Sequence, residues 1–329
     1  MNPTETLTIG LDLGDRRHTA CVLHADGHIV AEEVITNTRE CLAAFAGRWP
    51  GATIIMETGT HSPWVSRLFA ACGHPVHVAN ARKVRAIAQS PTKSDQEDAR
   101  MLARLGRADP ALLSPIQHRS EAGQRALLRI KVREALVRSR VNQMNSVHFL
   151  LKSLGLQVPS GSKATTFTRK LRPMLDAATC ALVEPLLGMI DALNARIKQL
   201  DTELESFARE QYPVTERLRQ VDGVGPLTAL AFVLTIEDPK RFPKTRDAGA
   251  YLGLVPRRDQ SGNTDKQLPI TKAGNVQLRC LLVNCAHYIL GPFGPPSHLR
   301  EAGLRIAARG GKSAKKRAVI AVARKLAVK

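Results

Sequence analysis

The chain has 329 residues, of which 43% are hydrophobic and 23% charged, and its formal net charge is +19. This composition is typical of a soluble globular protein, and the length allows two or three domains. The opening residues, MNPTETLTIG, lack the order of a secretory signal, and the longest largely apolar stretch, residues 227–236, is too short to span a bilayer. We therefore expect a cytoplasmic protein with no membrane partner.

Basic residues gather near the carboxy-terminal end. Residues 300–329 contain ten lysines and arginines and one acid, Glu301. Such density favours contact with nucleic-acid phosphates, although a solvated basic tail has the same composition. Aromatic residues make up only 4% of the chain, so base stacking is not the main mode of binding. We predict that Lys315, Lys316 and Arg317 contact a nucleic-acid backbone.

Cysteine and histidine give no sign of a structural zinc site. The six cysteines are scattered without a C-x-x-C pair, so we expect reduced thiols in the core. His74 and His77 flank a predicted strand, and we expect them at the surface.

The first hundred residues alternate strand and helix patterns. LTIGLDLG is a strand, TACVLHADGHIVAEEVI a hairpin that turns at residues 25–27, and TIIME and PVHVAN are further strands. Helices are expected at 38–49, at 62–72 and around Val84 and Arg100. Three meandering strands followed by alternating helices and strands is the order of a ribonuclease H-like mixed sheet. We assign it to residues 1–110.

The middle of the chain, residues 111–210, is helical. Apolar residues recur every seven positions along two seams. The seams contain Ile130, Val137, Met144 and Leu151 in one helix, and Leu186, Leu193, Leu200 and Phe207 in the other, interleaved with Ile190, Ile197 and Leu204. We predict an antiparallel coiled-coil arm, with packing inside one domain as the alternative. The first helix is rich in arginine, and we expect Arg129 and Arg133 to face nucleic acid.

A mainly helical unit is predicted over residues 211–329. VDGVGPLTAL fits a helix-hairpin-helix motif, in which the amides near Gly223 and Gly225 bind a phosphate. A plain Gly-Pro turn between helices is the alternative. Residues 249–279 form a long polar segment with several glycines, which is either an ordinary surface loop or a functional one.

Four carboxylates are candidates for a metal site. Asp12 lies within the first strand, Glu57 ends a later strand, and Asp95 and Asp98 share one face of the following helix. In a ribonuclease H-like sheet the first and fourth strands are neighbours and the last helix packs across them, so the four would converge. Such a set suits Mg²⁺ ions. The alternative is that Asp95, Glu97 and Asp98 only begin a helix, with Ser94 and Glu97 as a capping box.

The second candidate chemistry lies in Arg257-Arg258-Asp259-Gln260-Ser261-Gly262. Arg257 and Arg258 could bind a scissile phosphate, Ser261 could attack it, and Gly262 would let the backbone approach. An ordinary turn serine is the alternative.

Six motifs occur in a characteristic order: GLDLG, METGT, KSDQEDARMLA, VDGVGPLTA, GLVPRRDQSG and TKAGN. Over nearly its whole length the chain resembles the DEDD transposases of bacterial insertion sequences, a family of bridge-RNA-guided serine recombinases. The resemblance implies a Holliday-junction-resolvase-like domain, a coiled-coil arm and a transposase domain. The last helix of the family is expected to continue beyond ARKLAVK.

The resemblance also implies the roles of particular residues. The DEDD set falls on Asp12, Glu57, Asp95 and Asp98 with Mg²⁺, and the serine nucleophile falls on Ser261. We add Lys272 of TKAGN to the expected nucleic-acid contacts. The implied partners are donor and target double-stranded DNA, a noncoding bridge RNA, and further copies of the chain in a homodimer or homotetramer at the bacterial nucleoid.

The sequence therefore predicts a transposase that cuts and rejoins DNA through a phosphoserine intermediate. A structure-selective Mg²⁺-dependent endonuclease, which forms no covalent intermediate, is the alternative enzyme. GLDLG also resembles the first phosphate loop of actin-like ATPases and sugar kinases, but the arginine-rich helical region fits those folds poorly. ARGGKS lacks the first glycine of a phosphate loop, since Ile306 stands there. An architectural nucleic-acid binder is the non-enzymatic alternative.

Overall fold

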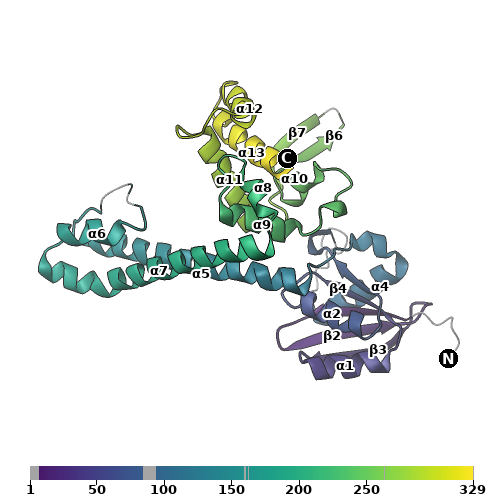
Figure 1. Ribbon diagram of the computed structural model, residues 1–329. Coiled ribbons are helices and arrows are strands. Elements are labelled where there is room, and N and C mark those ends of the chain that lie inside the picture. Colours follow the sequence, from purple (N-terminus) through teal and green to yellow (C-terminus); the bar gives the residue numbers. More distant parts are fainter. Residues whose placement is uncertain (1–6, 84–93, 159–160, 162, 263, 329) are drawn as a thin grey trace. The chain divides into compact units, whose positions relative to one another are not determined.

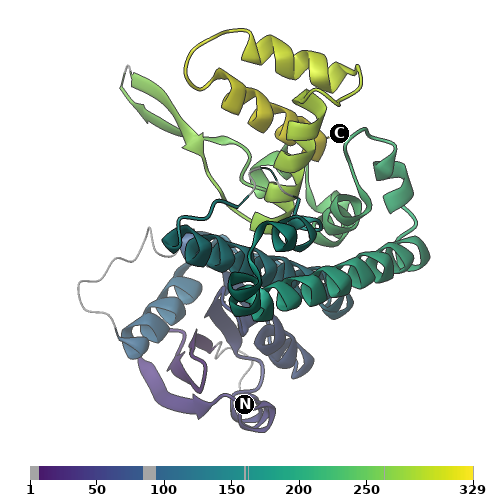
Figure 2. The ribbon, with the colours of Figure 1, turned by 90° about the vertical axis from the view of Figure 1, so that its left-hand side faces the viewer.

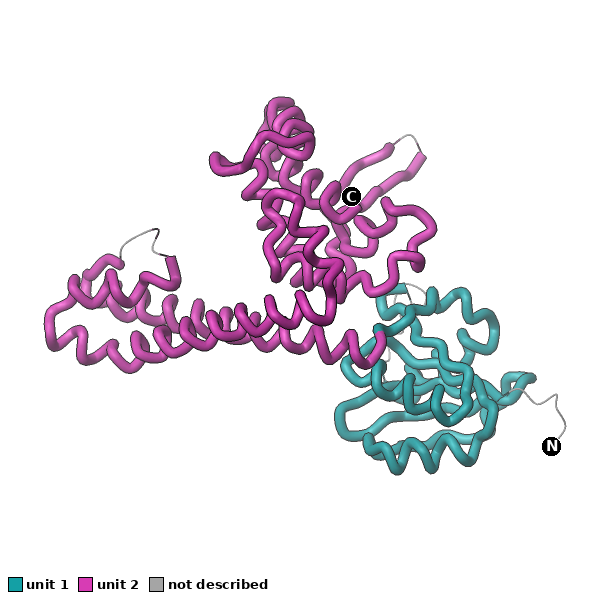
Figure 3. The backbone as a smooth tube through the Cα atoms, in the orientation of Figure 1, with its two compact units in different colours: residues 1–119 teal, residues 120–329 magenta. Residues whose placement is uncertain are grey.

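The computed structural model describes residues 7–83, 94–158, 161, 163–262 and 264–328 (Figure 1). The helix predicted around Val84 and part of the link predicted between the two long helices lie outside these ranges. The chain forms two compact units, Met1–Arg119 and Ser120–Lys329 (Figure 3).

The first unit is built on a five-stranded mixed sheet. Its strands are β1 (Thr8–Leu13), β2 (Arg17–Leu23), β3 (Ile29–Thr36), β4 (Thr53–Glu57) and β5 (Val76–Ala79). They lie in the order β3-β2-β1-β4-β5, with β1 antiparallel to β2 and parallel to β4. The first three strands form the predicted meander, turning at Gly27 with a φ of 96°. The predicted adjacency of the first and fourth strands is also observed.

Helices cover both faces of this sheet. They are α1 (Arg39–Arg48), α2 (Ser62–Ala71) and α4 (Asp95–Ala108). Ile9 and Leu11 of β1 point to the face where Phe45 of α1 and Phe69 of α2 pack. The opposite face is covered by α4, whose Ala99 packs against β2. The alternation of side chains along β1 thus divides the unit into three layers.

The contact between α4 and β1 is unusually close. A Cβ on Gly10 would lie 2.0 Å from the carbonyl oxygen of Ala99, and a Cβ on Gly106 would lie 2.3 Å from Cγ1 of Ile55 in β4. Arg107, in the last turn of α4, donates to the carbonyl of Ala25, beside the amino-terminal end of β1. The helix therefore runs opposite to β1, and its first turn lies toward the carboxyl end of that strand.

The expectation that His74 lies at the surface is wrong, and the expectation that the cysteines lie in the core is wrong in part. His74 is buried instead of exposed, because its Nδ1 lies 2.9 Å from the carbonyl oxygen of Ala52 and its ring packs edge-on against Phe69. All six cysteines are free, but only Cys21 and Cys285 are buried. Burial raises the pKa of the Cys21 thiol to about 11, so this thiol is unreactive at neutral pH.

The second unit begins with two long helices that pack side by side, α5 (Glu121–Ser153) and α7 (Ala177–Gln211), as Figures 1 and 2 show. A short helix, α6 (Phe167–Leu171), lies between them in the chain. Arg133 pairs with Asp201 and Arg140 with Asn194, so the helices are antiparallel. The predicted seam faces inward, and its buried members on α7 are Ile190, Ile197 and Leu204.

Among the described residues, α7 is the one helix whose length and composition would suffice to cross a membrane. Its apolar window of 18 residues is longer, though less apolar, than the 227–236 stretch singled out from the sequence. In the structure the first half of α7 contains Asp191 and Glu184, which both form ion pairs with Arg172. The apolar residues Val183 and Leu187 of the same half pack in a cluster with α5 and α6.

The remainder of the second unit packs around a core that includes the base of the helix pair. Its helices are α8 (Thr215–Arg219), α9 (Pro226–Ile236), α10 (Asp247–Tyr251), α11 (Val276–Leu290), α12 (His298–Ala307) and α13 (Ala314–Val328). A two-stranded sheet, β6 (Pro256–Ser261) with β7 (Thr264–Ile270), forms within the polar segment predicted as a loop. The basic carboxy-terminal residues do not form a solvated tail, because Ala318, Val322 and Ala323 of α13 are buried.

Enlarging Gly10 should weaken the first unit. We expect Gly10→Ala to lower the free energy of unfolding by about 1–3 kcal/mol or more, because the added methyl meets backbone atoms that cannot move aside alone. Gly47 is the matched control, since it is exposed in α1 with no atom near its Cβ position. Gly47→Ala should stabilise by about 0.5–1 kcal/mol. Thermal unfolding of the full chain checks both, and equal melting temperatures would contradict the packing argument.

Candidate active site

Asp12 and Glu57 lie at the carboxyl ends of two neighbouring parallel strands. The last pair between β1 and β4 is Leu11 with Met56, so Asp12 and Glu57 each follow that pair by one residue. Both carboxylates are half-buried. Since side chains alternate along strands, Asp12 shares the face of Gly10 and Glu57 shares the face of Ile55. That face is the one covered by α4.

The other two acids lie in the first turn of α4, which is directed toward the same strand ends. Asp95 and Asp98 precede Leu102 on one side of the helix, and Leu102 packs against Ile55 of β4. Asp98 is half-buried and Asp95 is exposed. The fold therefore brings all four predicted acids to one edge of the sheet.

The third acid of the first turn, Glu97, has a different partner. Glu97 Oε1 accepts from Arg100, and Arg100 also forms a two-pronged bond to Glu32 of β3, with distances of 2.5 and 2.7 Å. Ser94 Oγ accepts from the backbone N–H of Glu97 at 3.2 Å, as the capping-box pattern predicts. Helix capping and ion pairing thus account for Ser94 and Glu97, whereas Asp95 and Asp98 share with them only the favourable position of acids in a first helical turn.

The four carboxylates are not closely clustered. Among the described residues, the only three side chains that bring metal-ligand atoms within 4.8 Å of one another are His24, Asp26 and His28 in the β2–β3 turn. Like charges repel, so carboxylates that share an edge separate as far as their side chains allow. A bound divalent cation would be needed to draw them together.

Ser261 is the last residue of β6, at the end of the exposed β6–β7 hairpin. It pairs with Thr264 on β7, and Gly262 in the connecting turn has a φ of 54°, a conformation that favours glycine. All residues of β6 are exposed. The conformation of the turn is reason enough for a glycine here, and a close approach of the backbone to a phosphate at Gly262 stays a prediction.

The two arginines before Ser261 lie on opposite faces of β6. Arg257 and Ser261 are separated by an even number of positions, so regular alternation would put them on one face, although the register with β7 is irregular between Pro256 and Arg258. Arg258 lies on the other face and binds Asp265 of β7 through two bonds of 2.8 and 2.5 Å. This guanidinium lowers the pKa of the Asp265 carboxyl. Arg257 is therefore the arginine placed to share a phosphate with Ser261.

The hairpin is anchored where the segments before β6 and after β7 meet backbone to backbone. A Cβ on Gly253 would lie 2.2 Å from the backbone nitrogen of Ala273, and one on Gly274 would lie 2.0 Å from the carbonyl oxygen of Tyr251. Lys272, the predicted nucleic-acid contact, lies in this anchor with a φ of 54°. Arg279 of α11 is buried and donates to carbonyls on both segments, so it fixes the anchor.

The predicted helix-hairpin-helix segment is formed by α8, a turn and α9. Gly223 in the turn has a φ of 84°, and a side chain there would meet Tyr288 of α11. Gly225 is the N-cap of α9, and no side chain caps that end of the helix. The glycines thus have packing and capping roles in the fold, and phosphate binding by this turn stays a prediction.

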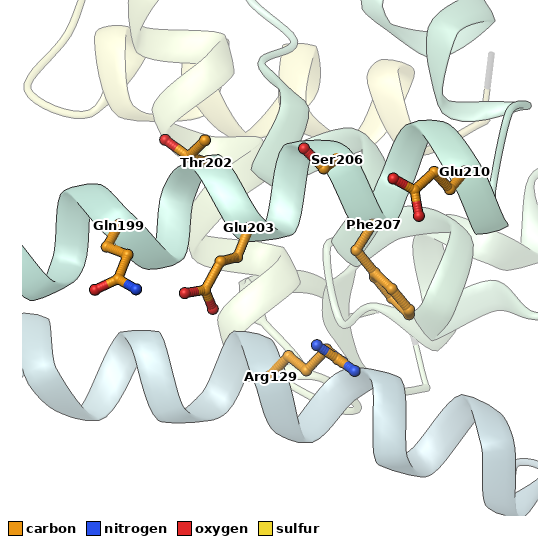
Figure 4. A pocket seen from close by; sticks show the side chains of 7 residues that line it. All are labelled: Arg129, Gln199, Thr202, Glu203, Ser206, Phe207 and Glu210. Carbon is orange, nitrogen blue, oxygen red and sulfur yellow. The ribbon is translucent and has the colours of Figure 1, made fainter.

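The arginines of α5 are engaged within the helix pair. Figure 4 shows Arg129 in a groove of about 620 Å³ between α5 and α7, where its guanidinium lies 4.6 Å from the centre of the Phe207 ring. Glu203 and Glu210 also line this groove. Arg133 is only 18% exposed and pairs with Asp201. These contacts make Arg129 and Arg133 weaker candidates for nucleic-acid binding than the sequence suggested.

An exposed basic surface lies where α12 turns into α13. Its exposed members are Arg309, Lys312, Lys315, Lys316 and Arg317. Arg309 and Lys312 lie in the turn itself, whereas Lys315, Lys316 and Arg317 extend from α13, whose apolar side is buried. A fixed array of cations suits a polyanion of regular spacing.

Sequence reasoning missed three features. The first is Asp265, which neutralises Arg258 and could have been found only from the hairpin register. The second is the network in which His61 contacts Asp15 and accepts from Trp64, close to the strand ends. The third is the cluster of His24, Asp26 and His28, whose H-x-D-x-H spacing is visible in the sequence.

Two family models match parts of the chain. A family model for the DEDD domain of IS110-type elements, described as "Transposase", matches residues 9–155. A second, described as "Transposase IS116/IS110/IS902 family", matches residues 215–298. The first covers the strands and helix that carry the four acids, and the second covers the hairpin that carries Ser261.

Several curated proteins are similar along most of their length. The transposase for insertion sequence element IS1111A of Coxiella burnetii is 26% identical over 86% of this chain and 77% of its own. The transposase for IS1328 of Yersinia enterocolitica is 28% identical over 86% and 84%. A pilin gene-inverting protein of Moraxella bovis is 27% identical over 83% and 76%. The chain therefore belongs to the IS110/IS116/IS902 family of insertion-sequence transposases, enzymes that recombine DNA.

Proposed function

We propose that this transposase excises and inserts its element by cutting and rejoining double-stranded DNA through a phosphoserine intermediate on Ser261. In this proposal Asp12, Glu57, Asp95 and Asp98 hold Mg²⁺. The observation that carries it is the placement of the four acids at one edge of the sheet, with Asp12 and Glu57 ending neighbouring strands under α4.

The donor set of this edge fits a hard divalent cation, because it consists of carboxylate oxygens alone. When bound, Mg²⁺ would neutralise negative charge on a phosphodiester and orient it for attack. The protein contributes a fixed frame: Asp12 and Glu57 extend from a buried sheet, and Asp98 extends from a helix locked against that sheet at Gly10.

Ser261 supplies the covalent step. Its Oγ attacks phosphorus, so that an Oγ–P bond forms and one P–O ester bond of the DNA strand breaks. The hydroxyl proton passes to solvent or a base, and the departing oxygen takes up a proton. The number of phosphodiester bonds is unchanged, so attack by a strand hydroxyl on the phosphoserine rejoins DNA without ATP. Arg257, on the face of Ser261, would neutralise charge on the attacked phosphate.

The proposed partners are two or four copies of the chain, donor and target DNA, and a noncoding bridge RNA that pairs with both. Each composite site would join the carboxylates of one protomer to Ser261 of another. Within the second unit we assign α5 and α7 to an arm and residues 211–329 to the domain that carries Ser261. Support for RNA guidance comes from the low aromatic content of the chain and its exposed cations, which suit backbones more than bases. We place the complex at the bacterial nucleoid.

The covalent step predicts a defined adduct. Denaturing the reaction of the protein with element-end DNA, RNA and Mg²⁺ should leave DNA attached to Ser261, as mapped by peptide mass. Ser261→Ala should lose the adduct and strand exchange while keeping DNA affinity. Thr264→Ala is the matched control, because Thr264 faces Ser261 across the hairpin. Cleaved DNA without an adduct would instead indicate a metal-dependent endonuclease.

The metal site predicts a contrast between two neighbouring acids of α4. Asp98→Asn should reduce DNA cleavage by about 100-fold or more, because the Mg²⁺ that would orient the reacting phosphate loses a charged ligand. Glu97→Gln removes an acid that faces Arg100 instead, so cleavage should stay within a few-fold of the wild type. Initial cleavage rates at saturating Mg²⁺ measure the effect of each variant. An equal loss of rate in the two variants would contradict the placement of Asp98, and not Glu97, at the metal site.

The basic surface predicts a change in salt dependence. Each phosphate contact adds about 0.9 to the slope of log affinity against log salt. The triple variant Lys315→Ala, Lys316→Ala, Arg317→Ala should therefore lower the slope by about 2–3. A control that removes Arg125, Arg138 and Arg172, each paired with a carboxylate, should change it little. An unchanged slope in the triple variant would show that Lys315, Lys316 and Arg317 do not contact nucleic-acid phosphates.

A further inference from the structure

The β2–β3 turn holds a compact group of two imidazoles and a carboxylate. Oδ1 of Asp26 lies 2.7 Å from Nδ1 of His28 and 3.2 Å from Nδ1 of His24. The two rings stack with their centres 4.8 Å apart. His28 and Asp26 are exposed, and His24 is about one-quarter exposed, so the group opens to solvent.

The backbone of the turn fixes these three side chains. The N–H of His24 donates to the carbonyl of His28, and the N–H of Gly27 donates to the carbonyl of His24. Gly27 has a φ of 96°, which an ordinary side chain would strain. The ligand atoms are therefore arranged by a tight turn between two paired strands and do not depend on flexible loops.

Oδ1 of Asp26 is the atom that all contacts of the group share. The backbone N–H of His28 donates to it at 3.0 Å, and both imidazoles contact it. A carboxylate between two imidazoles is a ligand set of mixed nitrogen and oxygen. Such sets favour borderline transition metals such as Zn²⁺ and Co²⁺ over Mg²⁺.

We propose that His24, Asp26 and His28 form a surface site for a divalent transition metal, with solvent completing the coordination. This site is separate from the four carboxylates proposed to hold Mg²⁺, because it lies in the turn next to the amino-terminal end of β1. The metal would replace the hydrogen bonds between Asp26 and the imidazoles with stronger coordinate bonds, and would fasten β2 to β3 at that end.

Arg107 weakens this site. Its guanidinium donates to the carbonyl of Ala25 at 3.0 Å, and Cζ lies 3.1 Å from the Cβ position of Gly27. A fixed positive charge so close to a bound cation repels it. Removing the charge should therefore strengthen metal binding. If Arg107 only stabilised the turn, removing it would weaken metal binding instead.

Titration of the full chain with Co²⁺ tests the proposal. Imidazole and carboxylate ligands at low coordination number give visible absorption bands that are stronger than those of Co²⁺ surrounded by oxygens alone. We expect one strongly absorbing Co²⁺ per chain, displaced by Zn²⁺. His24→Ala and His28→Ala should each weaken binding at least tenfold, and Arg107→Gln should strengthen it several-fold.

Two controls separate this site from others. His298→Ala removes an exposed imidazole of the second unit and should leave the absorption unchanged. Asp12→Asn should also leave it unchanged, since the carboxylate edge is a different site. Absorption that survives both His24→Ala and His28→Ala, or that disappears in Asp12→Asn, would overturn the proposal. So would the absence of strong absorption in the wild type.

Discussion

The structure of the first unit depends on the close approach of α4 to β1 at Gly10. Because no side chain separates them there, the helix lies directly on the sheet, and its direction is set by Arg107 at one end and by Arg100 near the other. The first turn of α4 is thereby directed to the strand ends that carry Asp12 and Glu57. A larger residue at position 10 would move the acids of two elements apart.

The lysines and arginines behind the net charge of +19 fall into two groups: some pair with other side chains of the protein, and others are exposed and can bind a polyanion. Along α5 and at its junction with α7, arginines pair with acids or lie over an aromatic ring, so much of their charge is used within the molecule. The β6–β7 hairpin contains one arginine of each kind. Arg258 is bound to Asp265, whereas Arg257, which alternation puts on the face of Ser261, remains exposed. The exposed cations of the α12–α13 turn have no such role. That turn is therefore one place in the second unit where a polyanion can bind without breaking an internal ion pair.

Much of the fold could be predicted because its elements carry strong periodic signals. The strand at residues 53–57 is buried on both sides, so its sequence is a continuous apolar run. The seam through Ile190, Ile197 and Leu204 repeats every seven residues, as in two helices that pack side by side. The acids at positions 12, 57, 95 and 98 could be grouped because the strand order follows from the succession of elements.

The β6–β7 hairpin could not be predicted in this way. Both of its faces are largely solvent-exposed, so polar residues occupy almost every position and no alternation marks it as two strands. Partners distant in sequence were also hidden, as with Arg133 and Asp201, which meet only after α5 and α7 pair. His74 was misplaced for a related reason, because its burial depends on a carbonyl 22 residues away.

The central claim of this account is that the acids at one edge of the first unit act as a single metal site. A crystal structure of the protein with DNA and Mn²⁺, using anomalous scattering to locate the metal, tests it most directly. We expect Mn²⁺ at about 2.0–2.3 Å from carboxylate oxygens of Asp12, Glu57 and Asp98. Mn²⁺ bound elsewhere, with these carboxylates remaining apart beside the DNA, would contradict the account.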